Sequence, residues 1–512
     1  MSKHALPAIL VSFALLTPAL AEPAPQAGDS YFTAGEQTLA ERRAVKPNKK
    51  HAKNVILFVG DGMDPTTIAA ARIFDGQSRG EPGEENFLSF ERFPFIAMAK
   101  TYTTTNQTPD SAGTMSAMMT GVKTKSLVIS LTDAVEVGDC KSALAAQALT
   151  IGELSEMAGL ATGVVSTARL THATPAAVYA HAADRDWESD GDLPESAKTD
   201  GCPDIARQLI DFPYGDGLEV AIGGGRSNFL PIDARDPEYP ERMGRRRDGR
   251  NLAEEWTKKS GGHRYVWNKP DFDAIDAGSG VRILGLFEPS HMRYEADRGA
   301  DAAGEPSLAE MTAKAIDVLS QNKNGFFLMV EAGRIDHAHH DGNAARALKD
   351  AQALSEAVAA ARAKTSEKDT LIIVTADHGH TLVFQGYPKK GNNILGLAAD
   401  EVAPPATDAE GHILARDGKP YTTLVYGNGP GSVFLGENKA GERPAPTPEE
   451  AAAPGYRQQA LIPADSETHG GQDVTIYASG PRAYLFGGVV EQNYVFHVID
   501  DALDLTERAA MD

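Results

Sequence analysis

Short apolar runs alternate with Ala-rich stretches from Asn54 onward. Helical patterns between these runs cover residues 145–158, 307–321 and 343–364. Apolar runs without polar alternation are typical of strands that are buried on both faces. We therefore expect an α/β fold with a large, mostly parallel central sheet that is flanked by helices on both faces. The runs are NVILFVG, ATGVVST, EVAIGGG, GFFLMVEAG, TLIIVTAD and VTIYASG.

Two segments depart from this alternation. Residues 22–50 begin with polar, Pro- and Ala-rich sequence and become helix-like from Thr33 to Ala44, which predicts an N-terminal arm. Residues 386–466 are rich in Gly, Pro and Ala and have few strong apolar runs. We expect an inserted subdomain there, although a set of long loops would have the same composition.

The N-terminus has the pattern of a secretory signal. Lys3 precedes an apolar stretch of about a dozen residues, and Ala19-Leu20-Ala21 fits a small-x-small cleavage site. We expect residues 1–21 to be a signal peptide, and the protein to be exported to the periplasm or secreted. The alternative is a membrane anchor, but the stretch is short for a span. No later segment is long and apolar enough to span a bilayer.

Composition narrows the class of protein further. The 512 residues are 42% hydrophobic, enough for a large core, and the net charge is −22. Such an acidic chain is poorly suited to sequence-independent nucleic-acid binding. We expect the basic run RRRDGR at 245–250 to be a solvated loop. The two cysteines, Cys140 and Cys202, would form a disulfide in an exported chain, with two buried free thiols as the alternative.

Carboxylates and imidazoles follow several of the predicted strands. Alone, each is more typical of a turn residue, a helix cap or an isolated histidine. Gathered at the carboxyl edge of one sheet, they would repel one another unless a cation were present. Mixed Asp and His donors suit Zn²⁺, and carboxylate and hydroxyl oxygens suit Mg²⁺. The residues are Asp61, His172, Thr174, Glu331, Asp336, His340, Asp377, His378, His380 and His469.

Ser111 stands in NQTPDSAGTMSAMM, at the start of a predicted buried helix. It could be an ordinary helix N-cap after the turn at Pro109-Asp110. It could also be a nucleophile, because free N–H groups at a helix N-terminus favour an anion and a nearby metal would activate the hydroxyl. No histidine beside it in the sequence indicates a Ser-His-Asp triad, although triad partners need not be neighbours.

At these residues the sequence resembles the alkaline phosphatase family. The matching motifs lie in the family's order and span residues 54–480: NVILFVGDGM, TPDSAGTMSAMMTG, THATPAAVYAH, EAGRIDHAHH, TADHGH and ETHGGQDV. The resemblance implies that residues 22–512 form a catalytic domain that hydrolyses phosphate monoesters. The implied reaction passes through a phosphoserine at a site with two zinc ions and one magnesium ion, and an alkaline pH optimum follows.

The resemblance also assigns roles by position. It makes Ser111 the nucleophile and Arg185 the clamp on the phosphate oxygens; without it, Arg185 would be taken for a surface ion-pairing residue. By the same resemblance, His172 matches a position beside the magnesium site and His380 one near the phosphate, and neither need be a ligand. The implied metal ligands are Asp336, His340 and His469 for the first zinc, Asp377, His378 and Asp61 for the second, and Asp61, Thr174 and Glu331 for magnesium.

Three further features are implied in the same way. Cys140 and Cys202 match a family disulfide. The segment 386–466 falls where the family has a crown subdomain at a homodimer interface. A fourth metal site, for calcium, would use Glu238, the carbonyl of Phe287, Glu288 and Glu305; Glu305 stands where an Asp is expected and the spacing before it differs, so a solvated acidic loop is the alternative.

Two other kinds of protein remain open on the sequence. A related phosphodiesterase or sulfatase-like hydrolase would share the metal ligands, but a sulfatase would need a C/S-x-P-x-R motif where this chain has PDSAGTM. A non-catalytic zinc-binding protein would need the ligands but neither Ser111 nor Arg185. The sequence does not identify the physiological substrate, because such a site binds the phosphate group and makes few contacts with the rest of the substrate.

Overall fold

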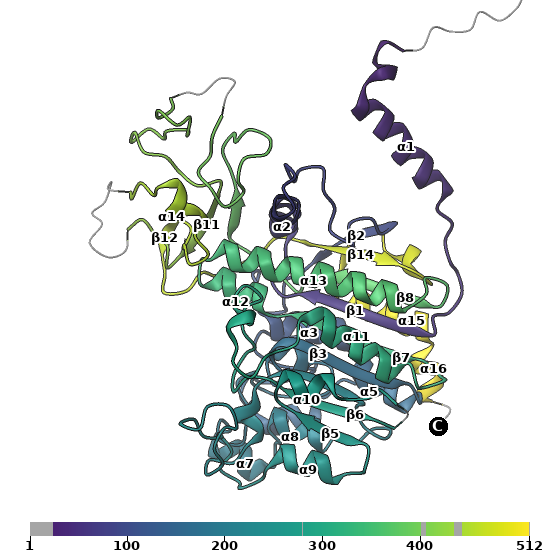
Figure 1. Cartoon of the computed structure of the whole chain (residues 1–512). Helices are drawn as coiled ribbons and strands as arrows, with labels where there is room; N and C mark the ends of the chain where they lie inside the picture. Colours follow the sequence, from purple (N-terminus) through teal and green to yellow (C-terminus); the bar gives the residue numbers. More distant parts are fainter. Residues whose placement is uncertain (1–23, 279, 401–405, 435–442, 511–512) are drawn as a thin grey trace, which may run out of the picture. The chain divides into compact units, whose positions relative to one another are not determined.

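The computed structural model describes residues 24–278, 280–400, 406–434 and 443–510 (Figure 1). The predicted signal peptide at 1–21 lies outside the described residues. The chain divides into two compact units, 1–46 and 47–512. In the first unit, α1 (Ser30–Ala44) contains the predicted helical stretch, and the Asp29 side chain caps it by accepting from the backbone N–H groups of Tyr31 and Phe32.

A ten-stranded sheet forms the centre of the second unit. All six apolar runs form strands in it, and the seven strands from β8 to β5 are parallel, so the predicted α/β fold is confirmed. Strand β14 is antiparallel to both of its neighbours. In spatial order the strands are β15 (Gly488–Glu491), β2 (Phe95–Lys100), β14 (Val474–Ser479), β8 (Thr370–Thr375), β1 (Asn54–Gly60), β7 (Phe326–Ala332), β3 (Ala161–Arg169), β4 (Val220–Gly224), β6 (Arg282–Leu286) and β5 (His263–Val266).

Helices pack in two groups against this sheet. One group contains α2 (Pro65–Ser78), α11 (Leu308–Leu319) and α13 (Ala344–Lys364); in Figure 1, α11 and α13 run in front of the strands. The other contains α3 (Ser111–Thr120), α5 (Ile151–Met157), α15 (Tyr494–Leu503) and α16 (Leu505–Ala509). The central strands β1, β7 and β8 are buried almost throughout, because both faces are covered.

The predicted helices at 307–321 and 343–364 correspond to α11 and α13, but the prediction for 145–158 is wrong at its start. A separate helix, α4 (Cys140–Ala145), ends there, and α5 begins only at Ile151. The reason is a capping box: the Thr150 hydroxyl accepts from the Glu153 backbone N–H, while the Glu153 side chain accepts from the Thr150 N–H.

The segment 386–466 contains little regular structure among its described residues. Strands β11 (Leu424–Gly429) and β12 (Ala460–Pro463) join β10 (Leu382–Phe384) in a three-stranded sheet, and α14 (Pro448–Ala452) is short. The assignment of this segment as an inserted crown-type subdomain stays a prediction. No helix in the described part of the chain has both the length and the apolar character needed to cross a membrane.

The disulfide prediction is confirmed: Cys140 and Cys202 are bonded, so the free-thiol alternative is wrong. The bond lies in a small apolar cluster, separate from the main core, that also contains Trp187 and Leu131. It thus connects the start of α4 with the segment that leads into α8 (Ile205–Ile210).

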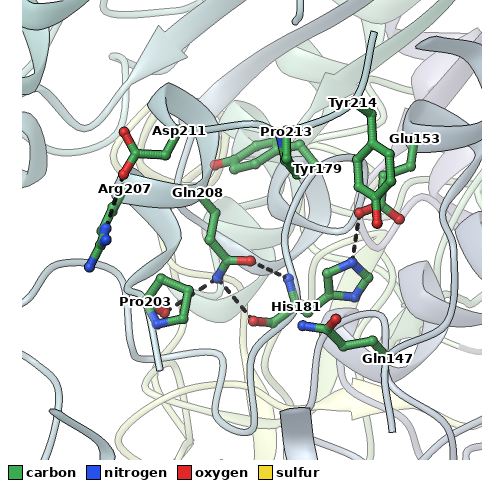
Figure 2. Close-up of a pocket in the computed structure, with 10 residues that line it drawn as sticks. All are labelled: Gln147, Glu153, Tyr179, His181, Pro203, Arg207, Gln208, Asp211, Pro213 and Tyr214. Atoms are coloured by element: carbon green, nitrogen blue, oxygen red, sulfur yellow. Dashed lines mark hydrogen bonds and ion pairs between the residues drawn. The ribbon is translucent and has the colours of Figure 1, made fainter. Parts of the chain in front are cut away.

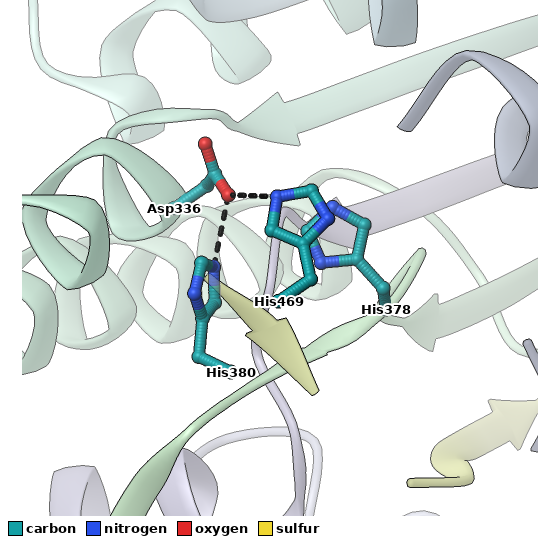
Figure 3. A group of neighbouring side chains, drawn as sticks. All are labelled: Asp336, His378, His380 and His469. Atoms are coloured by element: carbon teal, nitrogen blue, oxygen red, sulfur yellow. Dashed lines mark hydrogen bonds and ion pairs between the residues drawn. The ribbon is translucent and has the colours of Figure 1, made fainter. Parts of the chain in front are cut away.

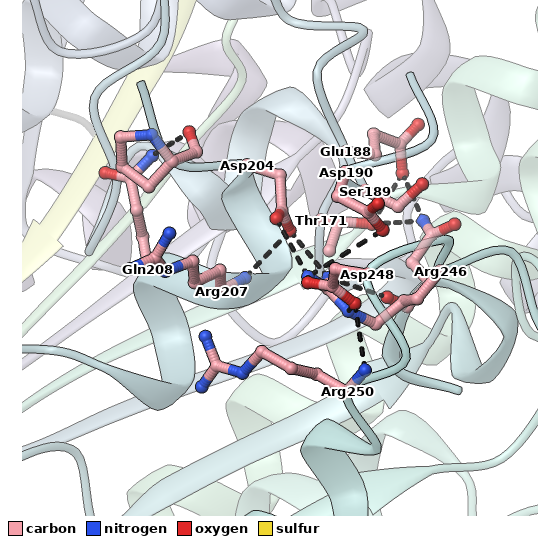
Figure 4. Close-up of polar contacts among 12 residues, drawn as sticks. Thr171, Glu188, Ser189, Asp190, Asp204, Arg207, Gln208, Arg246, Asp248 and Arg250 are labelled. Atoms are coloured by element: carbon pink, nitrogen blue, oxygen red, sulfur yellow. Dashed lines mark hydrogen bonds and ion pairs between the residues drawn. The ribbon is translucent and has the colours of Figure 1, made fainter. Parts of the chain in front are cut away.

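The prediction of a solvated loop at RRRDGR is wrong for Arg246. Its side chain is fully buried, whereas Arg245 and Arg247 are exposed as expected. Its Nη1 and Nη2 atoms lie 2.8 and 3.0 Å from the two carboxylate oxygens of Asp204, the N-cap of α8, and Asp248 pairs with it from the other side (Figure 4). The planar guanidinium satisfies both carboxylates at once, which allows burial despite its charge.

Candidate metal centre

The predicted site residues meet at the carboxyl edge of the parallel strands. In the register of β1, Val59 pairs with Glu331 on β7 and with Thr375 on β8, so Asp61 and Asp377 follow at the same level. Helix α12 (Arg334–His340) carries Asp336 and His340. His469, in β13 (His469–Gly470), pairs with His380 in the short strand β9 (Gly379–His380). Figure 3 shows Asp336, His378, His380 and His469 converging.

The first group consists of Asp336, His340 and His469. The Asp336 Oδ1 atom lies 3.2 Å from His340 Nε2 and 3.3 Å from His469 Nε2, and the two imidazole nitrogens are 3.1 Å apart. A tetrahedral zinc ion with bonds of about 2.0–2.1 Å would separate its ligand atoms by roughly 3.3 Å. These three side chains therefore fit one zinc ion.

The second group consists of Asp61, Asp377 and His378. The His378 Nε2 atom lies 3.3 Å from both Asp61 Oδ1 and Asp377 Oδ2. Both of these oxygens are buried and have no hydrogen-bond donor, which is costly for a carboxylate unless a cation binds it. The Ser111 Oγ atom lies 3.1 Å from the same His378 nitrogen. The serine is thus next to this group.

The third group contains Asp61, Thr174 and Glu331. The Thr174 hydroxyl lies 3.5 Å from Asp61 Oδ2, and Glu331 Oε1 is buried without a donor, while Glu331 Oε2 accepts from Ser166 Oγ. This oxygen-rich set suits Mg²⁺. His172 also approaches it, since one nitrogen lies within 4.8 Å of both carboxylates.

The charges of these groups explain why they would take cations. Burial, followed by the charge of Asp377, raises the pKa of Asp61 well above its ordinary value. Burial also raises the pKa of Glu331 to about 8. Burial opposes ionisation of Asp336 as well, but His340, His380 and His469 together hold its pKa well below the ordinary value. Bound metal ions would remove the repulsion between Asp61 and Asp377.

His380 is held in place from both sides. Its Nε2 atom lies 2.9 Å from Asp336 Oδ1, and its Nδ1 atom lies 2.6 Å from Glu467 Oε2. These carboxylates outweigh the effect of burial and raise the pKa of His380 to about 10. In this position His380 can orient Asp336, and its predicted place near the phosphate stays a prediction. The sequence reasoning missed Glu467, although it lies within the quoted motif ETHGGQDV.

Ser111 is the first residue of α3 and is almost completely buried. The alternative that Ser111 is an ordinary N-cap is wrong, because Asp110 caps the helix and accepts from the Gly113 N–H at 3.3 Å. Asp110 Oδ2 also lies 3.2 Å from Arg185 Nη1, and Arg185 Nη2 lies 3.0 Å from His172 Nε2. The structure therefore brings Arg185 to the end of the helix that carries Ser111.

The residues of the predicted fourth site also lie together, but two arginines already contact them. Arg226 pairs with Glu238 Oε2 at 3.0 Å and donates to the Phe287 carbonyl at 2.9 Å. Arg293 Nε lies 3.2 Å from Glu288 Oε1.

Both oxygens of Glu305 accept from the backbone N–H of Arg293, at 3.1 and 3.3 Å. Asp301, which the sequence reasoning did not single out, also joins this group, because its Oδ1 atom lies 3.2 Å from Arg293 Nε. The Asp301 Oδ2 and Glu238 Oε1 atoms are both buried and have no hydrogen-bond donor. The changed spacing before Glu305 was the available signal for Asp301.

A buried serine at a helix N-terminus, next to carboxylate and imidazole groups that fit divalent cations, defines a metal-dependent hydrolase. The family model for alkaline phosphatase matches residues 52–505. The chain belongs to the alkaline phosphatase family, and the predicted resemblance is confirmed.

Curated relatives agree along most of the chain. It is 45% identical over 459 residues to the tissue-nonspecific alkaline phosphatase of Gallus gallus, covering 88% of this chain and 84% of the relative. It is 43% identical over 460 residues to the alkaline phosphatase of Gadus morhua, covering 88% and 92%. The chain is thus a phosphate monoester hydrolase of this family.

Solved structures share the fold. The alkaline phosphatase of Thermus thermophilus superposes with a TM-score of 0.62 at 24% identity, covering 91% of this chain and 96% of that one. The alkaline phosphatase of the Antarctic bacterium TAB5 gives 0.59 at 21% identity, covering 89% and 99%.

Proposed function

We propose that the chain hydrolyses phosphate monoesters through a phosphoserine on Ser111, at a centre of two zinc ions and one magnesium ion. The observation that carries the proposal is the contact of 3.1 Å between Ser111 Oγ and His378 Nε2, because His378 also lies 3.3 Å from two unsatisfied carboxylate oxygens. A hydroxyl in that place is next to the cation that those oxygens need.

Each group of side chains would hold one ion. Asp336, His340 and His469 would bind the first zinc, and Asp377 and His378 the second, together with Asp61. Asp61 would also contribute to the magnesium site with Thr174 and Glu331. When bound, the ions act as Lewis acids that lower the pKa of the serine hydroxyl and of water and offset negative charge on the phosphoryl group.

The chain's own groups bind and orient the substrate. The planar guanidinium of Arg185 binds two phosphoryl oxygens, and Asp110 fixes its direction through the contact of 3.2 Å. Backbone N–H groups at the start of α3 favour the same anion. Ser111 then attacks the phosphorus in line with the leaving group: the bond between Ser111 Oγ and phosphorus forms as the ester P–O bond breaks, and the released oxygen takes a proton from water and leaves as the alcohol. In the second step water attacks the phosphoserine, Ser111 is the leaving group, and phosphate is released. Because Ser111 and water react after losing a proton, we expect an alkaline optimum.

Four other assignments belong to this proposal by resemblance to the family. Residues 1–21 are removed on export to the periplasm or outside the cell, and residues 22–512 form the catalytic domain. The crown-type segment 386–466 lies at the interface of a homodimer. Calcium would be held by Glu238, the carbonyl of Phe287, Glu288 and Glu305, and the free oxygen of Asp301 would be available to it as well.

Ser111→Ala tests the role of the nucleophile. We expect phosphate monoester hydrolysis to fall by at least about three orders of magnitude, with zinc and magnesium contents unchanged by elemental analysis and no phosphoryl label trapped on the chain. Ser155→Ala is the matched control, because Ser155 is a buried helical serine whose hydroxyl has no partner. Retained activity in Ser111→Ala would overturn the mechanism.

The same assays separate the rival functions. Wild-type protein that turns over a phosphate diester or a sulfate ester much faster than a monoester would be a different hydrolase with the same metal architecture. Wild-type protein that is fully loaded with zinc yet inactive on all three esters would be a metal-binding protein without catalysis.

A further inference from the structure

The segment 126–130 contains two residues in an unusual backbone conformation. Leu127 has φ of 71° and Ser130 has φ of 51°; among the described residues, positive φ outside glycine occurs at only two other positions, Arg482 and Asp504. A side chain disfavours this left-handed region, so such residues persist only where surrounding contacts hold them, and they occur often at functional sites. The question is what holds Leu127.

The peptide groups of Leu127 connect the two parts of the proposed phosphate site. Its N–H donates to Asp110 Oδ2 at 3.1 Å, and its carbonyl accepts from the Arg185 N–H at 2.7 Å. Asp110 caps the helix that begins with Ser111. One residue therefore contacts both the N-terminus of the nucleophile's helix and the backbone of the arginine.

Neighbouring contacts extend this connection on both sides. The Ser130 N–H donates to Ser116 Oγ at 2.7 Å, within α3, and Ser116 Oγ lies 3.2 Å from the Val128 carbonyl. Ile129 forms a two-way bridge with Ala182, with N–O distances of 2.9 and 3.1 Å. The segment 126–130 is thus bonded along its length between α3 and residues 182–185.

The far end of the Arg185 segment is also fixed (Figure 2). The Gln208 amide makes two hydrogen bonds of 2.9 Å with the backbone of His181, and the His181 ring lies 2.8 Å from Glu153 Oε1. The other ring nitrogen lies 2.9 Å from the Ser130 carbonyl. With residue 181 held in this way, the hydrogen bond to Leu127 fixes the backbone of the segment at Arg185 itself, in addition to the side-chain contacts of Arg185 with Asp110 and His172.

The side chain of Leu127 does not explain its conformation. It is 44% exposed, so its packing demands little of the backbone. The two peptide hydrogen bonds, by contrast, need the carbonyl and the N–H to point in these two directions.

We propose that Leu127 is a positioning residue, whose left-handed backbone sets the placement of Arg185 relative to Ser111 and thereby the affinity for the phosphoryl group. The inference rests on the proposed function, in which Arg185 binds phosphate. It assigns the role to the conformation of residue 127 and not to its side chain.

Two substitutions at the same exposed position separate conformation from side chain. Leu127→Val introduces a β-branched residue that resists positive φ, whereas Leu127→Asn introduces one that adopts it readily. We expect Leu127→Val to raise KM for a phosphate monoester and the inhibition constant of inorganic phosphate by about tenfold, roughly the loss of one well-placed hydrogen bond, with a smaller change in kcat. Leu127→Asn leaves both constants within about twofold of their wild-type values.

Control variants make the test specific. Leu149→Val changes another exposed leucine, which has an ordinary backbone, and leaves both constants unchanged. In an Arg185→Ala background, Leu127→Val has no further effect on the inhibition constant, because the residue acts through Arg185. Thermal unfolding and metal content of each variant are measured alongside, so that misfolded protein is recognised.

The outcomes distinguish the inference from the function on which it rests. If Arg185→Ala leaves the inhibition constant of phosphate unchanged, the proposed role of Arg185 fails. If Arg185→Ala raises it but folded Leu127→Val binds phosphate as wild type does, or if Leu127→Asn is as impaired as Leu127→Val, the positioning role of Leu127 is wrong.

Discussion

Individual buried acids illustrate how burial and charge act on single residues. Glu156, at the end of α5, is 4% exposed, and its Oε1 atom has no hydrogen-bond partner. Burial, followed by the nearby carboxylate of Glu219, raises the pKa of Glu156 from 4.5 to about 9. Glu219 itself accepts from the Thr162 N–H at 2.8 Å and pairs with Arg282 at 2.9 Å. Glu156 is thus protonated in the folded protein near neutral pH.

This protonation predicts a loss of stability toward alkaline pH. Because the folded pKa lies above the unfolded value, the contribution of Glu156 is fully present below pH 4.5 and is lost as the pH rises to about 9. The loss is about 1.4 kcal/mol per pH unit for one proton. We expect Glu156→Gln, which cannot ionise, to unfold in urea with a smaller decrease in midpoint between pH 6 and pH 9.

Glu449→Gln is the control, since Glu449 lies exposed in the first turn of α14 and should leave the pH dependence as in wild type. Parallel curves for wild type and Glu156→Gln would show that Glu156 is already ionised in the folded state.

At the residue scale, the sequence could predict most of the site residues but not the residues that hold them in position. Ligand-type residues stand out because several of them lie just after the end of a predicted strand, as Asp61 and Asp377 do. Supports such as Leu127 act through their backbone, so nothing in their side chains indicates a role. Asp110 was visible beside Ser111, but its contact with Arg185 joins positions 75 residues apart. Only the folded chain shows such a contact.

At the scale of elements, buried strands were easier to predict than edge strands. The apolar runs of β1, β7 and β8 identify them directly, whereas β2 alternates between buried and partly exposed positions and β15 is exposed over half its length. The start of one helix was misplaced because helical composition continued from α4 to the Thr150 cap. The run at 245–250 was misjudged because composition does not show which arginine meets a buried carboxylate.

That run provides a prediction about the loop that connects to α8. Arg246→Ala removes the partner of Asp204, which is 1% exposed, and so leaves a buried charge. We expect a loss of about 3–5 kcal/mol in the free energy of unfolding, measured as a lowered midpoint in urea. Arg247→Ala, at an exposed position in the same run, should change it by less than about 0.5 kcal/mol. Equal effects of the two variants would mean that the buried pair contributes nothing particular to stability.

At the scale of the whole molecule, the metal groups connect parts of the chain that are far apart in sequence. Asp61 follows β1 and His469 precedes β14, and between them in the sequence come the other proposed ligands on β7, on α12 and just after β8. We expect metal removal to destabilise the entire fold, because an ion that binds only the folded protein stabilises it by about 4 kcal/mol at 1,000 times its Kd. A chelator at pH 8 should lower the thermal midpoint, and added Zn²⁺ and Mg²⁺ should restore it.

Two histidine variants test whether that effect arises at the proposed centre. His469→Ala should lose most of the shift on adding zinc, whereas His412→Ala, in the partly exposed Asp408–Glu410–His412 group, should keep it. A midpoint that does not change when elemental analysis shows the metal to be gone would contradict the structural role of the ions.

The position of His469 near the C-terminus has a consequence for biosynthesis. The ribosome makes Asp336 and His340 well over a hundred residues before it reaches their partner at 469, and β14, which follows His469, must still insert between β2 and β8. With the ligands proposed above, a nascent polypeptide therefore cannot complete the first zinc site during most of translation. Metal loading becomes one of the last events of maturation, and chains that stop short of position 469 should leave the ribosome without a closed zinc site.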